Sequence, residues 1–290
     1  MRTLAQLLRR DVPEEPDLAF TRVDPEKRIG FPAGKYTAAG PLLAPLLAGA
    51  IAVGFYGVLS FLPENGIQAM FTQRGAVPYA IVALTALSFM ILLIKRLKLR
   101  AQRRALDLKV LPGEDPGFVL TPASAEDVLS TLHRRVDDPS RFLLTHRIQT
   151  ALANLRNMGR IGDVDEVLSS QAEHDEGVVD SSYTLVRGLI WAIPVLGFIG
   201  TVWGLSIALG AFGGVLAEAQ DIGQLRTALQ GVTGGLSTAF DTTLEGLVAA
   251  LCVHLLMIVV RRREEQFLDD CKEYCQRYIV GRLRLTETEQ

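Results

Sequence analysis

Residues 227 to 260 read TALQGVTGGLSTAFDTTLEGLVAALCVHLLMIVV, and within these 34 positions only Asp241 and Glu245 carry a charge. Three further runs carry no charged side chain at all: residues 36 to 63, 75 to 94 and 188 to 217. Each of the four runs is long enough to cross a bilayer as one helix, which takes ~20 apolar residues. No segment alternates apolar and polar residues over strand lengths. The sequence therefore predicts an all-α membrane protein with four transmembrane helices.

Basic side chains are distributed unevenly around these four runs. Of the 30 Lys and Arg residues, seven precede the first run, fourteen lie between the second and third, and seven follow the fourth. Only Arg74 and Arg226 lie in the two short loops. Because Lys and Arg are retained on the cytoplasmic side during insertion, both termini and the long middle segment are predicted to be cytoplasmic. The formal net charge of -2 gives no general attraction to nucleic acid, so no nucleic-acid partner is expected.

The same pattern divides the chain into segments. The N-terminal arm is expected to be loosely ordered, because four prolines within the first 35 residues interrupt any long helix. The second span continues into KRLKLRAQRRALDLK without a helix breaker, so its helix is predicted to extend into a cytoplasmic helical region. The predicted segments are a cytoplasmic N-terminal arm (1–40), transmembrane helices 1 and 2 (41–94), a cytoplasmic helical segment (95–187), transmembrane helices 3 and 4 (188–260) and a cytoplasmic C-terminal helix (261–290).

The predicted cytoplasmic segments offer little room for catalysis. The 93 residues between the second and third spans are too few for a separate catalytic domain beside their helices, so the protein is not expected to be an enzyme. Thr121 and Pro122 are predicted to cap and begin a short helix there. Cys271 and Cys275 lie one helical turn apart, without the CxxC or His pair of a metal site. Reduced, structural thiols are expected, with no metal and no cofactor.

Small residues follow one stripe of the third span. On a helix Gly197, Gly200, Thr201 and Gly204 recur at i, i+3, i+4 and i+7, which is the spacing that lets another helix approach closely. Pro194 is expected to kink this helix. The Thr201 hydroxyl either faces the neighbouring helix or bonds back to its own.

The fourth span carries a polar stripe in which Thr238, then Asp241 or Thr242, and then Glu245 share one face. An ionised acid in mid-bilayer costs about 2.5–3.5 kcal/mol even on the lenient insertion scale, so such acids usually face protein or water and serve a function. The alternative is that both acids lie at the outer membrane interface. At ~1.5 Å per residue the 34-residue run would be ~51 Å long, against ~30 Å of hydrocarbon, so part of it must extend beyond the bilayer or bend.

A second polar face of the fourth span contains Thr243 and His254, roughly opposite Glu245. Counted along straight helices from the nearest basic residues, Thr243 lies ~27 Å and Thr201 ~21 Å above the cytoplasmic side. Two antiparallel helices therefore place these hydroxyls in neighbouring layers. His254 either relays protons toward the cytoplasm or packs as a neutral side chain.

The string PVLGFIGTVWG at residues 194 to 204, followed by GLSTAFDTTLEGLVAAL at 235 to 251 and three arginines at 261 to 263, resembles the MotA/TolQ/ExbB proton-channel family. The similarity covers roughly residues 167 to 263. The four-span plan is similar to the flagellar stator branch, whereas GTVWG is similar to the TolQ/ExbB branch. The charged positions by which a flagellar stator grips its rotor have no counterpart that can be placed here.

The resemblance implies a ring: a homo-oligomer, a pentamer, of this chain around a dimer of a MotB/TolR/ExbD-like single-span partner that carries a membrane Asp. Ion flow would protonate that Asp and rotate one component against the other. Thr201 and Thr243 match the family's hydroxyl-bearing pore positions, and Pro194 matches a proline that couples ion passage to movement. Thr238 stands where the ExbB-type pattern has a glutamate, which leaves open whether Asp241 or Glu245 lines the channel.

The expected function is therefore a proton-channel and motor subunit of the bacterial inner membrane, with residues 188–260 as the channel domain and either protons or sodium ions as the driving ion. The alternative is a non-conducting membrane scaffold whose polar stripe only joins helices. The residues expected in the ion pathway are Thr201, Thr243, Thr238, Asp241, Glu245 and His254. Those expected in helix packing and coupling are Pro194, Gly197, Gly200 and Gly204.

Overall fold

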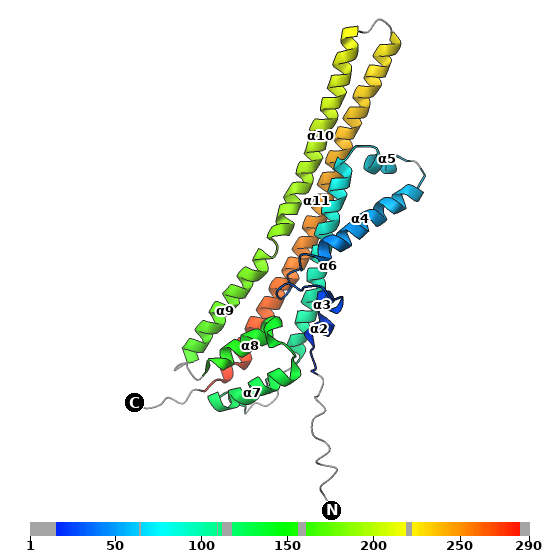
Figure 1. Cartoon of the computed structure of the whole chain (residues 1–290). Helices are drawn as coiled ribbons and strands as arrows, with labels where there is room; N and C mark the ends of the chain where they lie inside the picture. The colour runs from blue at the N-terminus through cyan, green and yellow to red at the C-terminus, as the bar shows by residue number, and fades with distance from the viewer. Residues whose placement is uncertain are drawn as a thin grey trace, which may run out of the picture. The chain divides into compact units, whose positions relative to one another are not determined.

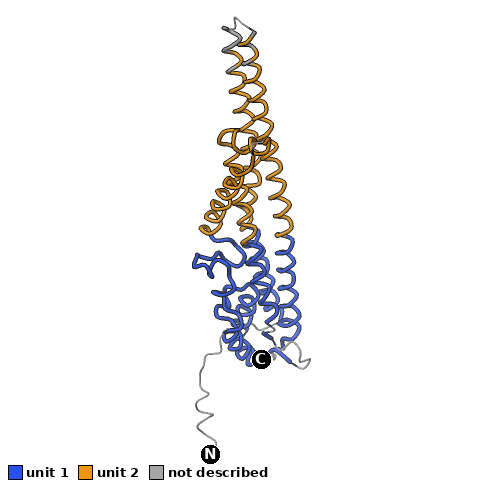
Figure 2. The backbone as a smooth tube through the Cα atoms, turned by 90° about the vertical axis from the view of Figure 1, so that its right-hand side faces the viewer, with its two compact units in different colours: residues 1–40, 95–181, 262–290 blue, residues 41–94, 182–261 orange. Residues whose placement is uncertain are grey.

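The computed structural model describes residues 16–63, 65–108, 110–111, 118–155, 161–218 and 222–284. Within these ranges the chain is all-α, as predicted, with two isolated β-bridges and no strand. It divides into two compact units, which Figure 2 shows in different colours. The first unit contains residues 1–40, 95–181 and 262–290, and the second contains residues 41–94 and 182–261.

The second unit contains the apolar helices (Figure 1). They are α4 (Leu43–Phe61), the short α5 (Gly66–Thr72), the first part of α6 (Val77–Asp107), α10 (Thr184–Glu218) and most of α11 (Ile222–Tyr278). Four helical stretches are long and apolar enough to cross a membrane: Leu43–Phe61, Val77–Asp107, Ile161–Gly210 and Leu229–Arg282. The chain is thus a multi-pass membrane protein with the four candidate spans that the sequence predicts.

Two helices run without a break beyond their uncharged stretches. α6 has 31 residues and continues past Ile94 through its basic segment, as predicted, and α11 has 57 residues. At ~1.5 Å per residue α11 is ~85 Å long, far more than the ~30 Å of hydrocarbon. A large part of α11 therefore lies beyond any bilayer that it crosses.

Aromatic and small apolar side chains join α4, α5 and α6 within the second unit. The Tyr56 and Tyr79 rings stack with centroids 4.5 Å apart, and Phe55 meets Phe71 edge to face at 5.2 Å. Many large apolar side chains of this unit remain exposed, with Phe61 at 92% and Trp191 at 72%. Apolar surface on this scale requires lipid or protein to cover it.

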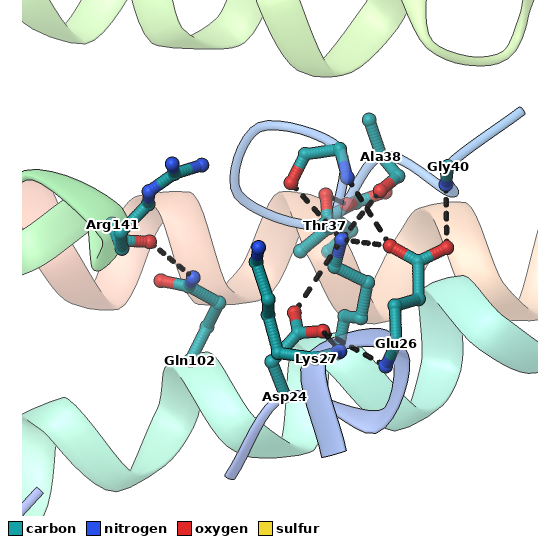
Figure 3. A network of polar contacts seen from close by, with 11 residues as sticks. Asp24, Glu26, Lys27, Thr37, Ala38, Gly40, Gln102 and Arg141 are labelled. Carbon is teal, nitrogen blue, oxygen red and sulfur yellow. Dashed lines mark hydrogen bonds and ion pairs between the residues drawn. The ribbon is translucent and has the colours of Figure 1, made fainter. Parts of the chain in front are cut away.

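In the first unit the N-terminal segment is ordered by a buried ion network (Figure 3). The Lys98 ammonium on α6 lies 2.8 Å from Glu26 Oε2 and 3.5 Å from Asp24 Oδ2, and it donates to the Ala38 carbonyl at 2.7 Å. Glu26 also accepts from the Gly40 amide at 2.5 Å. All three charged side chains are almost fully buried.

The expectation of a loosely ordered N-terminal arm is therefore wrong for residues 16–40. The prolines do limit helix length, since α2 (Phe20–Val23) and α3 (Pro25–Arg28) have four residues each. Order comes instead from carboxylates that accept backbone amides and from a lysine about 70 residues away. Residues 1–15 lie outside the described part of the chain.

The rest of the first unit consists of α7 (Pro122–Arg135), η1 (Pro139–Arg141), α8 (Leu143–Ala153), α9 (Ile161–Ser181), η3 (Val280–Arg282) and the ends of α6 and α11. Thr121 caps α7 and accepts from the Ser124 amide, with Pro122 in the first turn, as predicted. Two further ion pairs are buried: Arg147 with Asp175 at 2.7 Å and Lys95 with Glu264 at 3.3 Å. Burial lowers the Lys95 pKa, although Glu264 opposes this shift.

Cys271 and Cys275 face the interior of the first unit from α11. Burial raises the pKa of Cys275 to about 12 and raises that of Cys271 as well, so both thiols stay protonated at neutral pH. Among the described residues no group of three or more His, Cys, Asp or Glu side chains could hold a metal ion.

Lys98→Met should destabilise the first unit by about 3–5 kcal/mol, because it leaves two carboxylates buried without their cation. The measurement is thermal unfolding of the detergent-solubilised protein, together with limited proteolysis within residues 16–40. Lys27→Met is the matched control, since Lys27 is exposed and its side chain is not part of the network. Equal stability of the two variants would show that the network does not hold the arm.

Candidate functional site

A close contact between α10 and α11 is built from glycines of α10. A Cβ atom at Gly197 would lie 2.8 Å from the Thr242 carbonyl oxygen, and one at Gly200 would lie 2.5 Å from the Thr242 hydroxyl. A Cβ atom at Gly204 would lie 2.8 Å from the Gly235 carbonyl oxygen. Real Cβ atoms essentially never come this close, so a side chain at any of these three positions would force the two helices or the Thr242 side chain to shift.

Two glycines of α11 contribute from the other side, and the sequence analysis did not single them out. A Cβ atom at Gly235 would lie 2.5 Å from the Ala208 Cβ, and one at Gly246 would lie 3.0 Å from the Ile193 carbonyl oxygen. The signal that would have found them is a second small-residue stripe at i, i+4, i+7 and i+11 of α11. It consists of Gly235, Ala239, Thr242 and Gly246.

Thr201 and Thr243 meet across this contact. Their hydroxyl groups are hydrogen-bonded to each other, and each lies 3.0 Å from the Ala239 carbonyl oxygen. The Thr201 hydroxyl also lies 3.3 Å from the Gly197 carbonyl oxygen, so its single proton has an acceptor on α11 and another on its own helix. Both side chains are half-buried. One hydroxyl from each helix thus forms a small polar cluster in an otherwise apolar contact.

Thr242 belongs to the same contact. Its side chain is fully buried, and its hydroxyl donates to the Thr238 carbonyl on α11 at 3.0 Å. From the sequence, Thr242 is only an alternative to Asp241 in the polar stripe. The structure directs Thr242 toward α10 and Asp241 elsewhere, because consecutive helical residues point about 100° apart.

Asp241 is paired with a basic side chain. Arg74, in the connection between α5 and α6, approaches Asp241 Oδ2 with Nε at 2.8 Å and donates from Nη2 to the Ser237 hydroxyl at 2.8 Å. Thr238 lies at the edge of this cluster, 3.5 Å from Arg74 Nη1. The side chains of Arg74 and Asp241 are 21% and 28% exposed. A salt bridge therefore accounts for the Asp241 charge within a single chain.

Glu245 lies in a different environment. It is only 6% exposed, and neither carboxylate oxygen has a hydrogen-bond partner among the described residues. The Tyr56 hydroxyl of α4 is also buried without a partner and lies within electrostatic range of Glu245. A carboxyl group in such a place needs a proton, water or a protein donor, because an unpaired buried charge is costly. Glu245 makes no hydrogen bond to Thr201 or Thr243.

The two remaining predicted residues are Pro194 and His254. α10 continues as a helix through Pro194. His254 on α11 is exposed in the single chain. The structure therefore brings Thr201, Thr243 and the three glycines of α10 together at one contact, whereas it separates Asp241 and Glu245 from that contact and leaves His254 at the surface.

The hydroxyl pair of Thr201 and Thr243 can bind a polar or charged ligand. Two hydroxyls offer a donor and several lone pairs to a protonated or ionised carboxyl group or to a small cation. Because the hydroxyls also bond to each other and to carbonyls, neither of these two hydroxyls is left unsatisfied when no ligand is present.

Comparison with known proteins bears on this contact. Residues 136–273 match the MotA/TolQ/ExbB proton channel family. The matched range includes all of α10 and most of α11, and it confirms the resemblance derived from the sequence. No match to the chain was found among curated proteins or among solved structures.

Gly200→Ala should destabilise the contact of α10 with α11 by about 1–3 kcal/mol, because the added methyl group would overpack against the buried Thr242. Gly210→Ala is the matched control in the same helix, since nothing lies within 4 Å of a Cβ atom there. Thermal unfolding in detergent should separate the two variants. Equal loss in both would indicate that helix propensity, not contact distance, governs the effect.

Arg74→Gln and Asp241→Asn should be non-additive in a double-mutant cycle, with a coupling of about 0.5–1 kcal/mol for a partly exposed pair. The measurement is the free energy of unfolding of the two single variants and the double variant. Arg226→Gln replaces Arg74→Gln in a control cycle, because Arg226 is exposed and makes no described contact with Asp241. Coupling of the same size in both cycles would show that the coupling comes from overall charge and not from a direct contact between Arg74 and Asp241.

Proposed function

Residues 136–273 match the MotA/TolQ/ExbB proton channel family, and from this premise we propose that the chain is the membrane subunit of an ion-driven motor. In this proposal, ions move down their gradient at the interface between this chain and a single-span partner. Their passage drives movement of one component against the other. The chain acts by binding and gating, without covalent chemistry.

The hydroxyl pair of Thr201 and Thr243 is the observation that carries this proposal. Both residues match hydroxyl-bearing positions of the family's pore, and both reach the same point between two apolar helices. When an Asp of the partner approaches this point, the hydrogen bond between the two hydroxyl groups can be replaced by a hydrogen bond to the Asp carboxyl group. The exchange costs little, because the number of satisfied polar groups stays the same.

The ring is proposed to be a pentamer around a dimer of a partner that carries a membrane Asp. Support comes from the exposed apolar face of α10, where Phe198, Ile199, Val202 and Trp203 border a groove of about 440 Å³. Neighbouring copies and lipid would cover such a surface, which is too apolar for water.

The acids receive separate roles in this proposal. Asp241, paired with Arg74, is assigned to the non-cytoplasmic end of the α11 span, where it joins α11 to the α5–α6 connection. Glu245 and His254 stay candidates for the ion pathway, because Glu245 is buried without a donor in the described chain and His254 is exposed. The distribution of Lys and Arg supports an orientation with both termini and the first unit on the cytoplasmic side, and the proposed membrane is the bacterial inner membrane. The driving ion is a proton or a sodium ion.

One observation favours the alternative of a non-conducting scaffold. The hydroxyls of Thr201 and Thr243 have full hydrogen-bonding sets within the chain, so the contact is complete without any partner. A scaffold would use these bonds only to join α10 to α11. The two functions differ in whether removing a hydroxyl affects ion flux or stability alone.

Thr243→Val should lower gradient-driven proton flux about tenfold, as expected if one hydrogen bond worth ~1.4 kcal/mol is lost at the barrier. The measurement uses vesicles that contain the chain with a single-span, Asp-bearing partner, under an imposed pH or sodium gradient. Thr201→Val should act similarly, and Thr243→Ser should retain flux.

Thr233→Val is the matched control, because Thr233 is exposed and bonds only to carbonyls of its own helix. Unchanged proton flux in Thr243→Val would show that Thr243 is not part of the ion pathway. Absence of flux in every variant, including the unaltered protein with its partner, would favour the scaffold.

A further inference from the structure

A basic groove lies in the first unit beside the end of the α6 span. Its volume is about 450 Å³, and one wall comes from α6 while the other comes from the N-terminal segment around α3. The lining combines three arginines with apolar side chains: Arg28, Arg100 and Arg104 with Pro25, Ile29 and Leu97.

The three arginines that line the groove have no acidic partner among the described residues. Other cations of the unit have acidic partners, among them Lys95, Lys98, Arg103, Arg135, Arg141 and Arg147. Arg28, Arg100 and Arg104 have none there, and all three are exposed. Three guanidinium groups around one groove therefore keep their donors free for an anion.

The α6 wall changes from apolar to basic along one face. Leu93, Leu97, Arg100 and Arg104 recur at i, i+4, i+7 and i+11, and the two leucines are 45% and 38% exposed. Arg100 follows the last residue of the uncharged run, Ile94, by six residues, or ~9 Å of helix. This rise carries the face from the hydrocarbon boundary across the headgroup layer, which is ~5–8 Å thick on each side.

The buried network holds the two walls together. Glu26 and Arg28 are two residues apart on α3, and Glu26 is bound by Lys98 of α6 at 2.8 Å. Lys98 lies between Leu97 and Arg100 in the chain but points into the interior. The groove is thus organised before any ligand arrives, which reduces the ordering cost of binding.

We propose that this groove binds an anionic phospholipid, with its phosphate on Arg28, Arg100 and Arg104 and an acyl chain along Leu97. The charge of the groove matches a phosphodiester, and its apolar rim matches the chain that a free phosphate lacks. Guanidinium groups are suited to phosphate oxygens because they offer paired donors in one plane. The proposal requires only that α6 spans the membrane, so it is independent of the motor function.

The experiment measures lipid binding to the delipidated full-length protein in neutral detergent. Dioleoylphosphatidylglycerol is titrated, and retained lipid is counted by native mass spectrometry. Dioleoylphosphatidylcholine and inorganic phosphate are the comparison ligands. The unaltered protein should bind phosphatidylglycerol at least tenfold more tightly than phosphatidylcholine, and inorganic phosphate at the same concentration should not compete.

The triple variant Arg28→Gln, Arg100→Gln, Arg104→Gln should weaken phosphatidylglycerol binding about a hundredfold, at about fivefold for each arginine near an anionic lipid. The control is a triple variant with the same change in net charge at exposed arginines outside the groove lining: Arg134→Gln, Arg277→Gln and Arg284→Gln. Leu97→Gln should weaken lipid binding while it leaves the charge unchanged.

Four outcomes would overturn the proposal. An equal loss of phosphatidylglycerol binding in the two triple variants would show that binding depends on net charge and not on the groove. Competition by inorganic phosphate, or unchanged binding in Leu97→Gln, would identify an anion site without a lipid chain. A lower oligomeric mass of the groove variant with unchanged lipid retention would identify the groove as a contact between copies of the chain.

Discussion

The backbones of α10 and α11 lie close together. This short separation determines which side chains can form hydrogen bonds between the two helices. In a bilayer, two apolar helices gain little from leaving lipid, so close packing and hydrogen bonds must hold them together. The missing side chains at Gly197, Gly200 and Gly204 bring the α10 backbone within reach of Thr242 and Thr243. Only at that separation can a short threonine side chain bond to a carbonyl of the opposite helix. The polar cluster is therefore a consequence of the glycines.

Charge in the second unit follows a different rule, because an acid must find a partner or lose its charge. Asp241 forms a salt bridge with Arg74, which offsets the free-energy cost of its charge within the chain. Glu245 has no donor among the described residues, one turn further along α11. Two acids that share a stripe in the sequence thus differ in what they demand of their surroundings. Asp241 is complete in a single chain, whereas Glu245 needs something from outside the described contacts.

Much of this could be predicted from the sequence where the signal is local. The uncharged runs, the unbroken helix past Ile94 and the Thr121 cap depend on neighbouring residues alone, and the structure has all three. The proximity of Thr201 and Thr243 could be predicted by counting the helical rise from the basic residues that flank each span.

What could not be predicted depends on partners far apart in the chain. Arg74 was noted only for its loop position, although its partner Asp241 was already a candidate. The N-terminal arm looked disordered because its prolines are local, while Lys98, which orders it, is about 70 residues away. Helical spacing says which residues share a face, but it does not say what that face meets.

Some cations of the first unit are buried in ion pairs and others are exposed without one, and this difference affects which of them can bind a ligand. Lys95, Lys98 and Arg147 are buried with carboxylates, so their charge is used to hold segments together. A paired guanidinium has few donors left, and displacing its carboxylate would leave a buried acid unpaired. Arg28, Arg100 and Arg104 carry no such cost because they have no acid to abandon among the described residues. The buried ion pairs thus hold the segments of the first unit in place. The exposed arginines are then held in a fixed arrangement in which they can bind a ligand.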